Sequence, residues 1–300
     1  MPVLVVGSVA LDHVKTQSEE HRDLLGGSAS FASYAASFYA PVRMVGVIGP
    51  DFPEPYRALL SRRGIDLAGL EVTDGQTFRW SGEYEADLNN RRTLSIALNV
   101  FEHFSPKIPA AYRETDYVLL ANIAPSLQAK VLDQIARPKF VVADTMDLWI
   151  EIARQDLIAL LGRIDLLILN DSEARMLTGE ANAFKAGRKI LAQGPRFVVV
   201  KKGEHGAILM SESETYVIPA YPLEEVLDPT GAGDCFAGAL IGYCAQKDDA
   251  TFATLREAVF HATLVASFNV EAFSLRRLES LEAAHLDTRA TRFREVAGLR

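Results

Sequence analysis

Six short runs of apolar residues, spread along the chain, constrain its fold more than any other feature. Because these runs are almost continuously apolar, a strand formed by any of them would be buried on both faces, as in a parallel sheet. They therefore predict a buried, mostly parallel sheet. The runs are Val3–Val6, Met44–Ile48, Tyr117–Leu120, Phe140–Ala143, Leu166–Leu169 and Phe197–Val200.

The segments between these runs have helical periodicity. In one of them, apolar residues recur at i, i+3, i+4 and i+7 from Phe31 to Phe38. Regular alternation of strands and helices is typical of an α/β fold with a doubly wound sheet and helices on both faces. A length of 300 residues with 49% hydrophobic content suits a single large domain, 1–300. The other helical segments cover roughly 126–136, 150–162, 182–193 and 251–267.

One region, from Thr77 to Phe104, departs from this pattern. Trp80 and Tyr84 lie in a segment in which every second residue is polar. A second segment with the same kind of alternation follows Asn89-Asn90. This pattern predicts a β-hairpin with one solvated face. Such a hairpin could be a lid over an active site or a static edge hairpin, and the pattern favours neither. We expect a β lid contributed by roughly 11–24 and 74–104.

Composition limits the class of partner and the compartment. A net charge of −8 argues against a nucleic-acid partner, which would require a basic face. Cys235 and Cys244 lie on one predicted helix, too far apart in sequence to bridge easily, which favours a reducing compartment. The sequence shows neither a signal peptide nor about 20 consecutive apolar residues, so we expect a cytoplasmic protein without a membrane partner.

The segment 228–241, which reads DPTGAGDCFAGALI, is the most informative motif. Pro229, Gly231 and Gly233 predict a turn, and Asp234 follows in the first turn of a helix. Amide groups exposed at such a turn, together with the helix dipole, can hold an anion. A carboxylate beside that anion could deprotonate a hydroxyl that attacks a phosphoryl group. The alternative is a tight loop capped by an aspartate.

Polar residues that follow the predicted strands are further candidates, because ligands of open parallel sheets bind at the carboxyl ends of strands. Asp12 follows the first run and could accept hydrogen bonds from two vicinal hydroxyls, or could be a solvated loop acid. Gly26 and Gly27 precede the Phe31 helix and allow close approach to a ligand. The first run lacks a Gly-x-Gly-x-x-Gly sequence, which argues against a dinucleotide-dependent dehydrogenase.

Three other strand ends carry charged or amide side chains. Asn170 and Glu173 could organise Mg²⁺ together with phosphate oxygens, or could form a helix-capping box. Lys201 could neutralise phosphate charge, although paired lysines also occur in solvated turns. Asp144 ends the Phe140–Ala143 run and is a candidate substrate-binding acid.

Together these segments resemble the PfkB/ribokinase family of carbohydrate and nucleoside kinases across nearly the whole chain. The resemblance implies a ribokinase-like fold, ATP as donor, Mg²⁺, and phosphorylation of a hydroxyl on a sugar or sugar-like substrate. It implies that Asp234 is the general base and that the 231–234 backbone is an anion hole. The residues that this resemblance assigns further are Gly231, Ala232 and Gly233 for catalysis, Gly26 and Gly27 for the sugar, Gly203 and Gly206 for the nucleotide, and Asp228 and Thr230 for a monovalent cation such as K⁺.

The sequence departs from the family at the acceptor side. The family often has Asn at the position of Phe31, and phenylalanine cannot bind a sugar hydroxyl. Phe31, Phe78 and Trp80 could stack a nucleoside base, or could pack within the lid. A nucleoside kinase is therefore an alternative. A non-catalytic nucleotide or sugar sensor on the same fold is another, although an intact Asp234 argues against it, because a sensor needs no base. Some relatives pair through lid strands, so a homodimer in which Trp80 and Tyr84 form the interface is a further expectation.

Overall fold

The computed structural model describes residues 1–85, 88 and 91–299, and its largest element is a nine-stranded sheet. Its strands run in the order β13-β12-β11-β10-β9-β8-β1-β4-β5, and all neighbours from β11 to β5 are parallel. Only β12 and β13 are antiparallel additions at one edge. The strands are β1 (Val3–Val6), β4 (Val42–Ile48), β5 (Ile65–Val72), β8 (Tyr117–Leu120), β9 (Phe140–Asp144), β10 (Leu166–Asn170), β11 (Phe197–Lys201), β12 (Ala207–Met210) and β13 (Thr215–Ile218).

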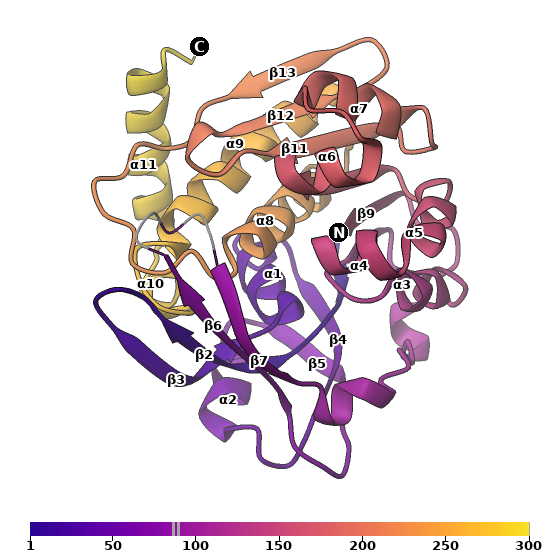
Figure 1. The fold of residues 1–300 in the computed structure, drawn as a ribbon, viewed down its shortest axis with the longest axis vertical. Coiled ribbons are helices and arrows are strands. Elements are labelled where there is room, and N and C mark those ends of the chain that lie inside the picture. Colours follow the sequence, from indigo (N-terminus) through magenta and orange to yellow (C-terminus); the bar gives the residue numbers. More distant parts are fainter. Residues whose placement is uncertain (86–87, 89–90, 300) are drawn as a thin grey trace.

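All six predicted strands are confirmed, and β1 shows why its apolar run is continuous. Val3 and Val5 pack into one hydrophobic core, whereas Leu4 and Val6 pack into a second core on the opposite face of the sheet. Helices cover both faces, as predicted, and Figure 1 shows their arrangement. The helices are α1 (Ser28–Ala36), α2 (Glu54–Arg62), α3 (Pro125–Leu132), α4 (Asp147–Ile152), α5 (Arg154–Leu161), α6 (Asp171–Thr178), α7 (Ala183–Leu191), α8 (Ala232–Lys247), α9 (Phe252–Asn269), α10 (Arg276–Glu279) and α11 (Ala283–Ala297).

One predicted helix, 150–162, is divided in two. The backbone at Ala153 has φ −132° and ψ 30°, which ends α4 and begins α5. The other predicted helices correspond to α1, α3, α7 and α9 with small shifts of their ends.

Helices α1 and α8 pack unusually closely. A Cβ atom at Gly238 would lie 2.1 Å from the backbone oxygen of Ala32, and one at Gly242 would lie 2.7 Å from that of Ala36. Glycine lowers helix propensity, so its presence in α8 is explained by this close approach of the two backbones. The contact fixes the start of α8 relative to the sheet.

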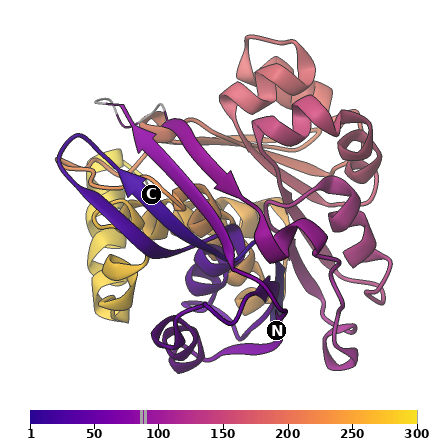
Figure 2. The ribbon, with the colours of Figure 1, turned by 60° about the horizontal axis from the view of Figure 1, so that its bottom comes forward.

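A second sheet has four strands, in the order β3-β2-β6-β7, and is built from the two segments of the expected lid; we use the name lid for these four strands. Its strands are β2 (Ala10–Lys15), β3 (Glu20–Gly26), β6 (Phe78–Tyr84) and β7 (Arg91–Ala97). The predicted hairpin is confirmed as β6 and β7, and the predicted turn at Asn89-Asn90 lies outside the described residues. β2 and β6 are parallel neighbours, which joins the two lid segments into one sheet. Figure 2 shows this sheet on the side of the molecule away from α6 and α7.

The Tyr84 side chain does not have the exposed position that is expected for a residue at a homodimer interface. Its side chain is buried against Val14, Leu24 and Phe273, and its hydroxyl lies 3.1 Å from the Thr230 hydroxyl. Tyr84 therefore links the lid to the 228–241 segment and is not available for a contact with a second copy. Trp80 is half-buried and packs against the same cluster.

Two further features of the described residues bear on the expected compartment and partners. Cys235 and Cys244 are both buried free thiols on α8. None of the helices in the described part of the chain combines the length and apolarity needed to cross a membrane.

Candidate active site

The 228–241 segment forms the predicted turn and helix. Gly231 has φ 77° and precedes Ala232, the first residue of α8, so Asp234 is the third residue of the helix. A Cβ atom at Gly231 would lie 2.4 Å from the ring of Phe31, so only glycine fits there. The Asn269 side-chain amide donates to the Thr230 carbonyl at 2.8 Å and fixes the turn from α9.

Phe31 therefore has a different place from the one expected. Its ring is buried beneath the turn with only 2% of its surface exposed. It supports Gly231 and is not available to stack a base. Phe78 stacks on Phe101 with ring centroids 5.3 Å apart, which is the lid-packing alternative for that residue.

Three backbone amides at the start of α8 have no acceptor among the described residues: those of Gly231, Gly233 and Asp234. The amide of Ala232 already donates to the Pro229 carbonyl at 3.2 Å, so the predicted anion hole is narrower than 231–234. Unpaired amides at a helix N-terminus form a site for an anion.

The carboxyl ends of three adjacent strands bring Asp144, Asn170 and Lys201 to the same edge of the sheet. The Lys201 ammonium lies 3.6 Å from the Asp144 carboxylate. A Cβ atom at Gly233 would lie 2.8 Å from the same ammonium, so the cation is directly beside the start of α8. The predicted residues Lys201, Gly233 and Asp144 thus lie together.

Electrostatic interactions in this cluster shift several pKa values. Burial favours the neutral form of Lys201, but the carboxylates of Asp144, Glu173 and Asp234 outweigh burial and raise its pKa. Burial, reinforced by repulsion from Asp144, raises the pKa of Asp234 to about 7. Burial also raises the pKa of Glu173 to about 7. A carboxylate with a pKa near neutrality is a stronger base than an ordinary aspartate.

Asn170 and Glu173 form the capping box that the sequence offers as an alternative. The Glu173 amide donates to Asn170 Oδ1 at 2.8 Å, and the Asn170 amide donates to Glu173 Oε2 at 2.7 Å. This arrangement fixes the buried Glu173 carboxylate at the start of α6, near Lys201 and Asp144. A role toward a metal remains a prediction.

Asp228 has a structural role. One of its oxygens accepts from the Thr230 amide at 2.9 Å, and the other accepts from the Ser274 amide at 3.2 Å. With 1% of its surface exposed, it ties the turn to the segment after α9. A monovalent-cation site at Asp228 and Thr230 remains a prediction.

On the acceptor side, Asp12 lies over the Gly-Gly pair. A Cβ atom at Gly26 would lie 2.0 Å from Asp12 Oδ2, and Gly27 has φ 90°, so neither position accommodates a side chain. Burial raises the pKa of Asp12 to about 8, and repulsion from Asp228 and Asp234 adds to this shift. Asp12 and Asp234 are therefore close enough to influence each other.

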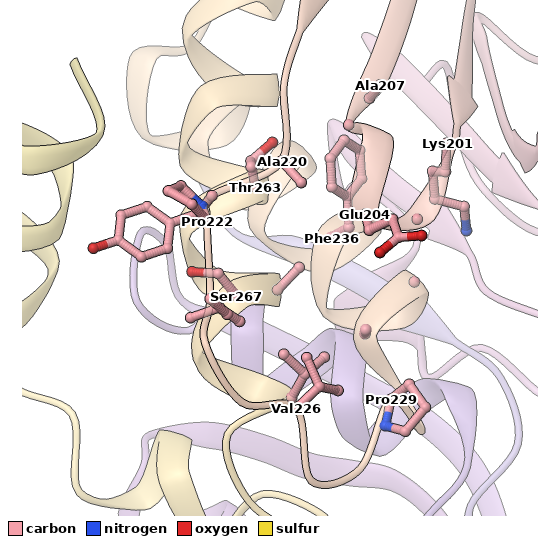
Figure 3. A pocket seen from close by; sticks show the side chains of 18 of the residues that line it. Lys201, Glu204, Ala207, Ala220, Pro222, Val226, Pro229, Phe236, Thr263 and Ser267 are labelled. Atoms are coloured by element: carbon pink, nitrogen blue, oxygen red, sulfur yellow. The ribbon is translucent and has the colours of Figure 1, made fainter. Parts of the chain in front are cut away.

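A pocket of about 520 Å³ opens beside the cluster and is lined by Lys201 and Gly233. Figure 3 shows Lys201 at one side of it. Gly203 and Gly206 line it, and their role toward a nucleotide remains a prediction. Residues of α8 and α9 also line this pocket and were not expected from the sequence. A usable signal is the spacing of Thr263 and Ser267, two polar residues four apart in the otherwise apolar stretch 262–268 of α9. The missed residues include Phe236 of α8 and Thr263, Ala266, Ser267 and Val270 at the end of α9.

Asn122, at the carboxyl end of β8, is a second residue that sequence reasoning missed. The Trp149 indole donates to Asn122 Oδ1 at 2.8 Å, and the Ser28 hydroxyl donates to the Asn122 carbonyl at 3.2 Å. The Asn122 amide nitrogen faces the Met146 sulfur at 3.1 Å, a weak acceptor. This hydrogen bond uses one of the two amide hydrogens, which leaves the second for a ligand.

Comparison with known proteins decides the family. The model of the pfkB family carbohydrate kinases matches residues 3–281. This chain belongs to the pfkB family of carbohydrate kinases. It is thus a phosphotransferase of the ribokinase-like group that phosphorylates sugars or nucleosides. Kinases of this family use ATP as the phosphoryl donor.

Individual relatives of this pfkB family member include both nucleoside and ribose kinases. A cytidine kinase of Thermococcus kodakarensis is 31% identical over 252 residues, covering 81% of this chain and 88% of that protein. Two solved structures share the fold. A Burkholderia thailandensis nucleoside kinase in complex with inosine has a TM-score of 0.80 at 22% identity and covers 99% of both chains. A putative ribokinase II from E. coli in complex with ATP and Mg²⁺ has a TM-score of 0.79 at 20% identity, covering 97% of this chain and 99% of that one.

Proposed function

We propose that residues 1–300 form one kinase domain that transfers the γ-phosphoryl group of ATP to a hydroxyl of a sugar or nucleoside. The observation that carries this proposal is the set of unpaired amides at the start of α8, next to Asp234 and Lys201. Phosphoryl transfer needs a base for the proton of the attacking hydroxyl and positive charge beside the transferred group. Around one point, a carboxylate supplies the first, and a buried cation and free amides supply the second.

In the proposed reaction, Asp234 accepts the proton of the attacking hydroxyl. The amides of Gly231, Gly233 and Asp234, with Lys201, stabilise the negative charge of the transferred group. Asn170 and Glu173 would hold Mg²⁺ together with phosphate oxygens, because Mg²⁺ needs only one or two protein ligands beside phosphate and water. Mg²⁺ neutralises phosphate charge when it is bound.

The acceptor is expected between the lid and the sheet. Asp12 would accept hydrogen bonds from its hydroxyls, with Gly26 and Gly27 allowing close approach. The lid strands would exclude water, which otherwise competes for the phosphoryl group. The Asp144 carboxylate is paired with the Lys201 ammonium, so it would affect the acceptor indirectly, by reducing the positive charge that Lys201 presents to it.

Similarity to a cytidine kinase favours a nucleoside over a free sugar, and the Asn122 side chain could contact its base. The Asn122 amide, oriented by Trp149, could donate to a ring oxygen or nitrogen of a base. Because Phe31 is buried, the base would rely on such polar contacts more than on stacking against that ring.

We further propose that β7 pairs with a second copy of the chain. Leu94, Ile96 and Leu98 are 45%, 53% and 42% exposed on this edge of the lid. An exposed apolar edge strand is prone to pair with another strand. Light scattering on the wild type and an Ile96→Lys variant tests this: we expect a dimer that the substitution weakens, and a monomeric wild type would contradict it.

A panel of acceptors tests the function. Purified protein with Mg·ATP is offered ribose, fructose, adenosine, inosine and cytidine, and phosphorylated product and ADP are quantified together. We expect one ADP per phosphorylated product with at least one nucleoside. Thermal shifts with the same ligands identify binding without turnover. A ligand that raises the melting temperature with ATP present but yields no product would support the sensor alternative.

A further inference from the structure

Thr263 and Ser267 form the polar part of the α9 wall of the pocket (Figure 3). Both are buried, at 8% and 7% exposure, and they lie one helical turn apart. The Thr263 hydroxyl donates to the Val259 carbonyl at 2.9 Å, and the Ser267 hydroxyl donates to the Leu264 carbonyl at 2.7 Å. Since each hydroxyl has one hydrogen, the two oxygens can offer only lone pairs to a ligand.

The C-terminal helix fixes this wall through Arg289. Its guanidinium donates to the Ser267 oxygen at 2.9 Å, so the rotamer of Ser267 is held from behind. The guanidinium carbon also lies 3.3 Å from the Phe268 ring centroid and 4.8 Å from that of Tyr221, which lines the pocket. Such contacts with aromatic faces favour a planar cation.

Arg289 is itself held by Glu271, with which it forms an ion pair. Glu271 has a second partner, Arg277, at 3.0 Å. Loss of Arg289 would therefore leave Glu271 paired, and the fold is expected to tolerate the change. This makes Arg289 suitable for testing its effect on the pocket.

The other side chains of the wall are apolar. Phe236, Ala266 and Val270 line the pocket together with Val226, and they can enclose a flat ring. An apolar slot whose buried side-chain hydroxyls offer only lone pairs fits an aromatic ring that carries N–H donors. A ring carbonyl at the same place would be repelled, because its oxygen lone pairs would face the lone pairs of the two hydroxyl oxygens.

We propose that Thr263 and Ser267 select a donor nucleotide whose base carries an exocyclic amino group, and that Arg289 is the positioning residue of this wall. The proposal rests on the proposed function, in which this pocket holds the donor. A site built to accept a hydrogen bond rejects a ligand that lacks the donor, because its buried acceptors are left unpaired. Adenine and hypoxanthine nucleotides differ at this group, since the 6-amino group of adenine is a carbonyl in hypoxanthine.

Calorimetry with Mg·ADP and Mg·IDP tests the selection without requiring turnover. We expect the wild type to bind ADP at least about tenfold more tightly than IDP. Thr263→Val removes the acceptor at nearly constant volume and should reduce this ratio several-fold. The matched control is Thr288→Val on α11, whose hydroxyl also donates to a carbonyl four residues earlier, at 2.8 Å, but which is exposed. It should leave the ratio unchanged.

Steady-state kinetics tests Arg289. Arg289→Met should raise KM for ATP about tenfold and lower the preference for ATP over ITP, with kcat and KM for the acceptor nearly unchanged. Arg292→Met, an exposed substitution on the same helix, is the control. A merely structural role for Arg289 would lower the melting temperature and leave the ratio of ATP to ITP unchanged.

The outcomes separate the two proposals. Equal affinity of the wild type for ADP and IDP, binding of neither at millimolar concentration, or an unchanged ratio in Thr263→Val would overturn the selection. If ADP is preferred but no acceptor is phosphorylated, the proposed function fails while the selection by Thr263 and Ser267 stands.

Discussion

Gly233 and Lys201 are in direct contact: a Cβ atom on Gly233 would lie 2.8 Å from the Lys201 ammonium nitrogen. This contact joins the start of α8 to the end of β11 and places a cation beside the free amides. The sheet topology brings the two residues together, because Lys201 ends a parallel strand and ligands collect at that edge.

A methyl group at Gly233 should therefore impair function more than stability. Gly233→Ala would displace the flexible end of Lys201 from the amides, so we expect kcat/KM for ATP to fall about 10- to 100-fold. The melting temperature should change little. In the control Gly162→Ala, the new Cβ would lie 3.9 Å from its nearest neighbour, the Ala159 oxygen, and activity should be unchanged. Full activity of Gly233→Ala would refute the importance of this contact.

The raised pKa of Asp234 predicts a pH dependence. A general base must be deprotonated, and burial raises the pKa of Asp234 to about 7. We therefore expect kcat/KM for the acceptor to increase about tenfold per pH unit below 7 and to level off above it. The profile should be measured from pH 5 to 9 with saturating Mg·ATP. A profile that is flat between pH 5.5 and 8 would exclude a base with this pKa.

Asp12 should reduce stability at high pH. Its pKa is about 8 in the folded chain, compared with an ordinary value of 3.8, so the folded state holds the proton more tightly. Stability from this group is complete below pH 3.8 and is lost as the pH rises through about 8. Asp12→Asn should thus raise the free energy of unfolding by about 1–2 kcal/mol at pH 9, with little effect at pH 4.

At pH 9, where Asp12 is ionised, the same Asp12→Asn variant should bind the acceptor less well, because an amide has one acceptor oxygen where a carboxylate has two. Denaturant unfolding at the two pH values measures the stability, and acceptor KM measures the binding. Equal stabilisation at both pH values would show that the ionisation of Asp12 is not the cause.

The packing of α1 on α8 predicts a purely structural effect. Gly238→Ala would place a methyl group 2.1 Å from the Ala32 carbonyl oxygen, a backbone atom that cannot move alone. We expect a loss of about 1–3 kcal/mol in the free energy of unfolding, despite the better helix propensity of alanine. Chemical denaturation measures this loss. A more stable variant would mean that the two helices separate easily.

The sheet could be predicted because its strands are buried on both faces. Runs such as Val3–Val6 have no polar side and hence a clear signal. Strands β5 and β13 were missed because they lie at the edges of the sheet, where exposed residues interrupt the apolar pattern. Strand β12 was missed as well, although it is buried, because its four apolar residues form a short run directly after the 203–206 loop. The Asn89-Asn90 turn falls on residues whose structure is not described.

The site could be predicted only in part. Asp234 and Lys201 follow from their positions after a turn and after a strand, which are local features. The burial of Phe31 against Gly231 depends on a contact between residues 200 positions apart in sequence. Thr263 was missed for a similar reason: on sequence alone, α9 has the composition of an ordinary core helix.

The most direct measurement is the single-turnover rate of Asp234→Asn with bound Mg·ATP and saturating acceptor. The account predicts a rate 10²- to 10⁴-fold below the wild type, about the usual contribution of a general base, with unchanged nucleotide affinity and melting temperature. A wild-type rate in a folded, nucleotide-binding Asp234→Asn variant would contradict it.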